Sequence, residues 1–203
     1  MMNGSLREEL VMAILSFVSI LAAVAAFLLV LPLIGIAYRE GPAAHVTGGF
    51  GEPSCRECHF DQPLNDASGR LFLRGVPDRY RGRQPYRVIV TIDRPGMTRG
   101  GFEISARFAS GDLRGRQAGS WRALDDRVQV VPSEADPALL FVQHNGSGSV
   151  IANPGSASWT IEWGAPESGS DAVQFNVAAN ASNDDASPLG DYIYVQEARS
   201  TPE

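Results

Sequence analysis

Short runs of alternating apolar and polar residues restrict the fold of this chain more than any other feature. In residues 101–108 every second side chain is apolar, and a period of two is typical of a β-strand with one buried face. The same pattern predicts strands at residues 86–92, 127–131, 139–144, 158–163, 173–178 and 192–196. Turn formers such as Asn153-Pro154-Gly155 separate these runs. We therefore expect an all-β fold, namely an antiparallel β-sandwich.

The second feature is the motif Cys55-Arg56-Glu57-Cys58-His59. Covalent attachment of haem c uses this spacing: the two thiols add to the two vinyl groups, and the histidine ligates the iron from one face. The chain has only two cysteines and three histidines, so composition alone does not explain their grouping. The motif predicts one covalent haem c held by Cys55 and Cys58, with His59 as the proximal axial ligand to the iron.

Three other uses of the same cysteines stay open at this point. A redox dithiol would be expected at the start of a helix in a βαβ unit, and no such pattern follows. A zinc site would combine Cys55 and Cys58 with two of the three histidines. A local disulfide would suit an exported protein.

The N-terminal part of the chain predicts a membrane anchor. Residues 11–38 carry no charge, and this run exceeds the ~20 apolar residues that a transmembrane helix needs. We expect residues 1–38 to form one anchoring helix. A cleaved signal peptide is the alternative, because Gly41, Ala43 and Ala44 supply small residues after the run. Covalent haem is attached outside the bacterial inner membrane, so the motif predicts a single-pass protein with its C-terminal domain in the periplasm.

Several motifs, in this order, resemble the bacterial form of the reeler, or reelin-type, β-sandwich domain, which is commonly preceded by a CxxCH segment. The resemblance covers roughly residues 46 to 196. It implies an Ig-like β-sandwich and an exported location, with residues 39–70 as linker and haem segment and residues 71–203 as the sandwich. The motifs that carry it are 48–59, 77–80 leading into 86–88, 100–102, 117–119, Trp159, Trp163-Gly164-Ala165-Pro166, 173–175 and 190–194.

A haem iron has a sixth position, and few residues are candidates for it. His144 ends the predicted strand 139–144 and precedes a turn. The reeler pattern carries a histidine in the corresponding strand, so we expect His144 as the distal ligand. Met97, in a glycine-rich loop, is the alternative, and a methionine would raise the reduction potential. His45 is a third candidate. Phe60 follows the motif and is expected to cover the haem.

Three further groups are expected to have ordinary roles. Trp159 and Trp163 share one strand face and should pack in the core. The acid-rich residues 183–185 with Asp191 lack the spacing of an EF-hand and read as an exposed turn rather than a calcium site. Arg79, Arg81 and Arg83 would form a solvated face, with haem propionates or lipid headgroups as alternative partners.

Composition and missing motifs exclude other classes. A net charge of −6 argues against nucleic-acid binding. No nucleophile elbow, phosphate loop or dinucleotide fingerprint occurs, so we expect no enzyme. The sequence predicts a membrane-anchored monohaem c-type cytochrome that carries single electrons to redox protein partners in a membrane complex. The alternative is a non-catalytic accessory subunit of a photosynthetic or respiratory complex, whose sandwich mediates protein contacts.

Overall fold

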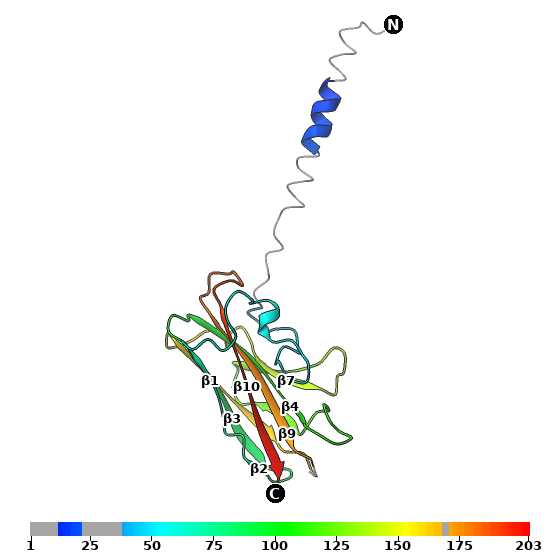
Figure 1. The fold of residues 1–203 in the computed structure, drawn as a ribbon, viewed down its shortest axis with the longest axis vertical. Helices are drawn as coiled ribbons and strands as arrows, with labels where there is room; N and C mark the ends of the chain where they lie inside the picture. The colour runs from blue at the N-terminus through cyan, green and yellow to red at the C-terminus, as the bar shows by residue number, and fades with distance from the viewer. Residues whose placement is uncertain (1–11, 22–37, 168–170) are drawn as a thin grey trace. The chain divides into compact units, whose positions relative to one another are not determined.

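The computed structural model describes residues 12–21, 38–167 and 171–203 (Figure 1). Residues 12–21 are helical, and residues 1–11 and 22–37, which together make up most of the predicted anchor, lie outside the described part. Within the described ranges, no helix combines the length and the apolar character that crossing a membrane requires. The helix and the unit that begins after it are therefore considered separately.

The body of the chain consists of two β-sheets. One sheet has the strand order β1-β3-β8-β5, and the other has the order β2-β10-β9-β4-β7-β6. All pairings are antiparallel except that of β10 with β2. The strands are β1 (Arg70–Arg74), β2 (Arg79–Tyr80), β3 (Pro85–Asp93), β4 (Arg99–Phe108), β5 (Ser120–Ala123), β6 (Val128–Pro132), β7 (Leu140–His144), β8 (Ser156–Gly164), β9 (Val173–Ser182) and β10 (Tyr192–Pro202). The predicted β-sandwich is thus confirmed.

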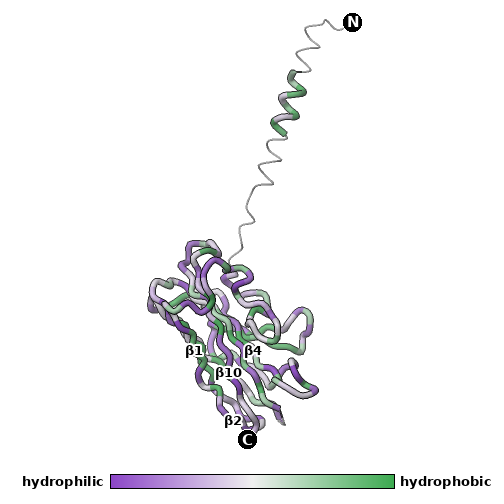
Figure 2. The backbone as a smooth tube through the Cα atoms, viewed as in Figure 1, coloured by the Kyte–Doolittle hydropathy of each residue, from purple (hydrophilic) through white to green (hydrophobic). Residues whose placement is uncertain are grey.

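The core lies between the sheets and follows from strand alternation. On β8, Trp159, Ile161 and Trp163 are buried on one face, as the sequence predicted. They meet the inward face of the six-stranded sheet, where Phe102 and Phe175 pack on the two tryptophans with ring centroids 4.6 and 4.8 Å apart. Each such pair is worth about 1 kcal/mol beyond its buried area. Alternating polar and apolar segments are visible along the strands in Figure 2.

The outward face of the six-stranded sheet is also buried, which alternation alone did not predict. On β4, Glu103, Ser105 and Arg107 point away from the core yet are at most 5% exposed. The segment before β1 covers them: the Val46 backbone N–H donates to Glu103 Oε1 at 2.7 Å. This segment carries the cysteine motif, so the motif lies against the polar, outward face of β4 and β9.

Candidate functional site

A short turn presents the motif side chains together. The 3₁₀ helix η1 (Cys55–Glu57) begins at Ser54, whose side chain accepts the Arg56 N–H at 3.3 Å. It ends as the N–H groups of Cys58 and His59 both donate to the Cys55 carbonyl, at 3.3 and 3.1 Å. Both cysteines and His59 therefore project from a single turn.

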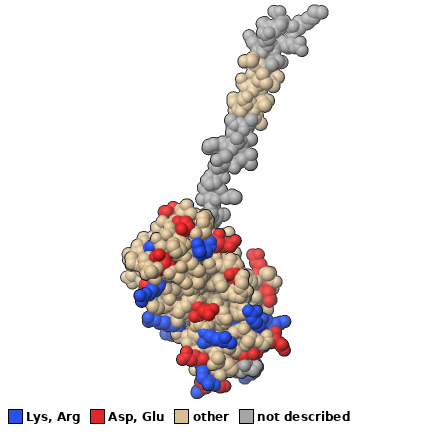
Figure 3. Space-filling view, viewed as in Figure 1, with Lys and Arg blue, Asp and Glu red and all other residues tan. Residues whose placement is uncertain are grey.

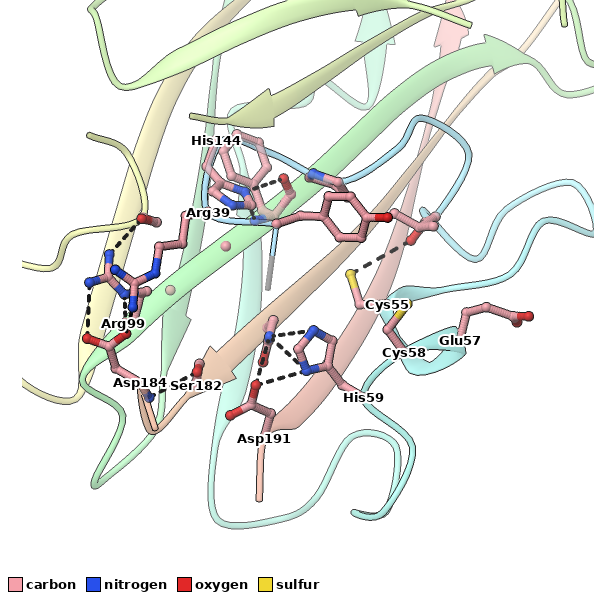
Figure 4. A pocket seen from close by; sticks show the side chains of 18 of the residues that line it. Arg39, Cys55, Glu57, Cys58, His59, Arg99, His144, Ser182, Asp184 and Asp191 are labelled. Atoms are coloured by element: carbon pink, nitrogen blue, oxygen red, sulfur yellow. Dashed lines mark hydrogen bonds and ion pairs between the residues drawn. The ribbon is translucent and has the colours of Figure 1, made fainter. Parts of the chain in front are cut away.

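These residues line a cavity of about 280 Å³ that also includes His144. Figure 4 shows His59 and His144 reaching the cavity from opposite sides, with Cys55 and Cys58 at one edge. The distal candidate comes from β7, far along the chain from the motif. The structure thus brings together four of the residues that the sequence singled out.

The ring of His144 is held against β4 by the backbone of that strand and by the space at one of its glycines. Its Nδ1 lies 3.1 Å from the Phe102 N and 3.2 Å from the Phe102 carbonyl oxygen, so it can accept from the first or donate to the second. The ring occupies the space where Gly101 lacks a side chain, since a Cβ there would lie 2.7 Å from Cε1. Burial lowers the pKa of His144, although backbone hydrogen bonds at Phe102 and Tyr38 oppose this. A neutral imidazole is the form that ligates a metal.

His59 is held by a buried acid. Its Nδ1 pairs with Asp191 Oδ2 at 2.8 Å, and Asp191 is only 1% exposed. Asn180 Nδ2 lies 3.3 Å from the same carboxylate oxygen and 3.3 Å from His59 Nε2. A carboxylate on the far nitrogen fixes the orientation of a ligating histidine and raises its basicity. The expectation of an exposed turn was wrong for Asp191 because β10 begins at the next residue and draws it inward.

The two thiols are free and differ in environment. Burial raises the pKa of Cys55 to about 12, and the charge of Glu103 adds to this effect. Its Sγ lies 3.9 Å from the Val46 carbonyl oxygen, to which it donates weakly. Cys58 is exposed. A redox dithiol depends on a lowered thiol pKa, so the environment of Cys55 disfavours that alternative. In the described ranges, no three His, Cys, Asp or Glu residues are grouped so as to hold a metal ion.

Two arginines line the side of the cavity away from the cysteines (Figure 4). Arg99 pairs with both carboxylate oxygens of Asp184, at 2.7 and 3.0 Å, and Arg39 reaches Asp184 Oδ1 at 3.3 Å. The hydrogen bond to Arg99 lowers the pKa of Asp184.

A buried ionic cluster fastens the motif segment to the sheet. Arg107 pairs with Glu52, which also accepts from His45 Nδ1 at 2.7 Å. The other ring nitrogen of His45 lies 2.5 Å from Ser133 Oγ. Burial raises the pKa of the neighbouring Glu103 to about 8. Both nitrogens of His45 are thus engaged in anchoring the segment.

The remaining predicted residues lie elsewhere. Met97 is 1% exposed and packs in the core, where it approaches Gly100 from the face opposite to His144. Phe60 is 59% exposed and does not line the cavity. Arg79 donates to the Pro202 carbonyl, Arg81 pairs with Glu203, and Arg83 pairs with Glu167. These three arginines also lie outside the cavity lining.

Sequence reasoning missed four contributors to this site: Arg39, Arg99, Gly101 and Asn180. Asn180 is on β9, and Arg99 and Gly101 are on β4. Their strands carry other polar residues, so no local signal set Asn180 and Arg99 apart. A glycine inside a strand, which often marks a close approach, was the signal for Gly101.

The fold and site define an all-β sandwich with a histidine- and cysteine-lined cavity on the outer face of its larger sheet. No protein-family model and no curated protein matches the chain. Among solved structures, it is similar to the reelin-N domain of F-spondin, with 18% identity, 73% of this chain and 96% of that chain covered, and a TM-score of 0.47. The human F-spondin reeler domain gives 18% identity over 73% of this chain and 99% of that chain, with a TM-score of 0.47.

A cohesin module from a Clostridium perfringens family 33 glycoside hydrolase is also similar. It shows 13% identity over 67% of this chain and 98% of that chain, with a TM-score of 0.42.

Proposed function

We propose that the chain is a membrane-anchored monohaem c-type cytochrome that carries single electrons on the periplasmic side. The observation that supports it is the shared cavity: Cys55, Cys58, His59 and His144 line one space although His144 is distant in sequence. When bound, a haem c would supply a one-electron couple at its iron.

The residues present fit this group. Cys55 and Cys58 would hold it covalently, and His59 and His144 would supply two nitrogen ligands. Asp191 orients His59, and the Phe102 carbonyl can fix the tautomer of His144 that leaves Nε2 free to ligate. The absence of a side chain at Gly101 lets the ring of His144 lie against β4. Two histidines favour a lower reduction potential than a histidine and a methionine.

The setting of the cofactor follows from the chain order. The predicted anchor at residues 1–38 precedes the motif closely, so the haem would stay near the membrane surface and serve redox partners in the same membrane complex. Acidic and basic side chains are interspersed over the face of the body drawn in Figure 3.

The test is to produce the full chain in a bacterium that attaches haem in its periplasm. We expect a mass increase of one haem, a pyridine haemochrome spectrum with both vinyl groups saturated, and loss of attachment in the Cys55→Ser, Cys58→Ser double variant. A wild-type chain that matures without covalent haem would contradict the proposal and favour the accessory-subunit alternative.

A further inference from the structure

Two arginines and one acid form the edge of the cavity opposite the cysteines. Arg39, Arg99 and Asp184 all line it, and Figure 4 shows them across the cavity from Cys55 and Cys58. We propose that Arg39 and Arg99 bind the propionate carboxylates of the haem. This inference rests on the proposed function and assigns the orientation of the cofactor in its site.

The chemistry of the cofactor gives the first argument. The two vinyl groups and the two propionates of a haem project from different sides of the macrocycle. Once Cys55 and Cys58 fix the vinyl side, the propionates must point away from η1. The residues at that side should therefore be cationic, and a guanidinium is the group best suited to a carboxylate because it donates two parallel hydrogen bonds.

Charge balance gives the second argument. Arg39 and Arg99 both pair with Asp184, so two positive charges share a single carboxylate. Among the described residues, the ion pairs made by these two arginines involve no other acid. At this edge of the cavity the guanidinium groups therefore outnumber the carboxylates, so an additional anion would be stabilised here. The other two carboxylates of the lining are those of Glu57 on the motif turn and Asp191, which pairs with His59.

The two arginines are held differently, which indicates separate tasks. Arg99 is fixed by Asp184 and by a 2.9 Å hydrogen bond from Nη1 to Ser149 Oγ, and its side chain is 22% exposed. Arg39 makes one longer contact and is 53% exposed. Arg99 is therefore a preformed partner for one carboxylate, whereas Arg39 can turn from Asp184 to the other.

The location also explains why the cluster of Arg79, Arg81 and Arg83 is not the propionate site. Arg81 pairs with Glu203 and Arg83 with Glu167, and Arg79 donates to the Pro202 carbonyl. They do not line the cavity. The guanidinium groups that do line it are those of Arg39 and Arg99.

The experiment uses the full haem-loaded chain with its propionate carboxyl carbons labelled with ¹³C through labelled 5-aminolevulinate. Reduced-minus-oxidised infrared spectra and reduction potentials are compared for wild type, Arg39→Gln and Arg99→Gln. The matched control is Arg122→Gln, because Arg122 makes the same two-bond pair with Glu162 at 2.9 and 2.8 Å on the other sheet.

We expect the labelled carboxylate bands to shift in both cavity variants and the potential to fall, since a lost positive charge favours ferric haem. The control should keep the wild-type bands and potential. Arg39→Gln, at an exposed position, keeps the test valid if Arg99→Gln fails to fold.

Three outcomes are decisive. Shifted bands in the cavity variants alone support the assignment. Covalent haem whose labelled bands are the same in Arg39→Gln, Arg99→Gln and wild type would overturn it while leaving the cytochrome proposal intact. A wild-type chain without haem would overturn both, and the mass of the protein separates this case from the previous one.

Discussion

His59 and His144 reach the same cavity from two differently built regions. His59 follows a loop turn, is partly exposed and depends on side chains, namely Asp191 and Asn180. His144 ends a strand, is 8% exposed and depends on the backbone of Phe102. A side-chain partner tunes the electron density of a ligand, whereas a backbone partner and a close-packed strand fix its position. We infer that His59 is the adjustable side of the site and His144 the rigid one.

The largest expected effect is a loss of stability with rising pH that affects the loop carrying His59 before it affects strand β7. The pKa of Glu103 is about 8 in the folded chain against an ordinary value of 4.5, mainly because of burial. The folded state therefore binds more protons than the unfolded state between these values. The stability that Glu103 contributes is complete below about pH 4.5 and is lost as the pH rises to about 8, by at most about 1.4 kcal/mol per pH unit.

Because Glu103 accepts the Val46 N–H, this loss should act on the loop that carries His59 before it reaches β7. Hydrogen exchange at pH 5 and pH 8 measures it, with Glu103→Gln as the control that removes the slope. Equal protection of residues 46–59 at both pH values would contradict the assignment.

The second prediction removes the partner of His59. Asp191→Ala takes away a buried carboxylate that pairs with His59 and also accepts the Asn183 N–H at 3.2 Å, so these donors lose a charged acceptor. We expect a loss of about 3 kcal/mol in the free energy of unfolding by denaturant titration. Asp185→Ala, an exposed acid in the same loop, should cost about 0.5 kcal/mol. Similar losses in the two variants would show that the His59–Asp191 pair does not hold the loop.

The third prediction tests whether Gly101 positions the ring of His144. Gly101→Ala places a Cβ 2.7 Å from His144 Cε1 and should cost about 2 kcal/mol while displacing the ring. Gly100→Ala is the matched control, because its Cβ would meet Ala157 at 2.9 Å on the core face instead. Both should lower the melting temperature, but only Gly101→Ala should alter the spectrum of the bound haem. Identical spectra would mean that Gly101 does not position His144.

These two regions also differ in how far the sequence could predict them. Strand alternation located β3, β4 and β6 to β10, because burial on one face leaves a period of two. It missed β1, β2 and β5, of which β2 and β5 are very short and β1 carries three consecutive apolar residues, at 71–73, without alternation.

The residues of the site divide in the same way into those that local sequence predicts and those that it does not. The motif and His144 are visible as residue types, so local sequence suffices to propose them. Asp191, Asn180 and the arginine pair depend on which strands become neighbours, and pairing β9 with β4 and β10 is a long-range event that spacing does not encode. The burial of the outward face of β4 could not be predicted from the alternation, because nothing local shows that residues 42–59 fold back over it.

The last comparison exchanges each histidine for methionine, and His144→Met is expected to have the smallest effect on stability among the site variants. His144→Met gives up the contact with the Phe102 backbone, which is worth about 1 kcal/mol. His59→Met should destabilise more, because it leaves the Asp191 carboxylate buried without its partner. Both variants of the haem-loaded chain should have a higher reduction potential than wild type, since a thioether favours ferrous iron.

The two potentials distinguish the regions further. In the His59→Met background, the added substitution Asp191→Asn should leave the reduction potential unchanged, because the carboxylate no longer contacts an iron ligand. In His144→Met the same second substitution should still raise it. Potentiometric titration of the four chains measures this coupling, and an Asp191 effect that survives in His59→Met would place the influence of Asp191 outside its contact with His59.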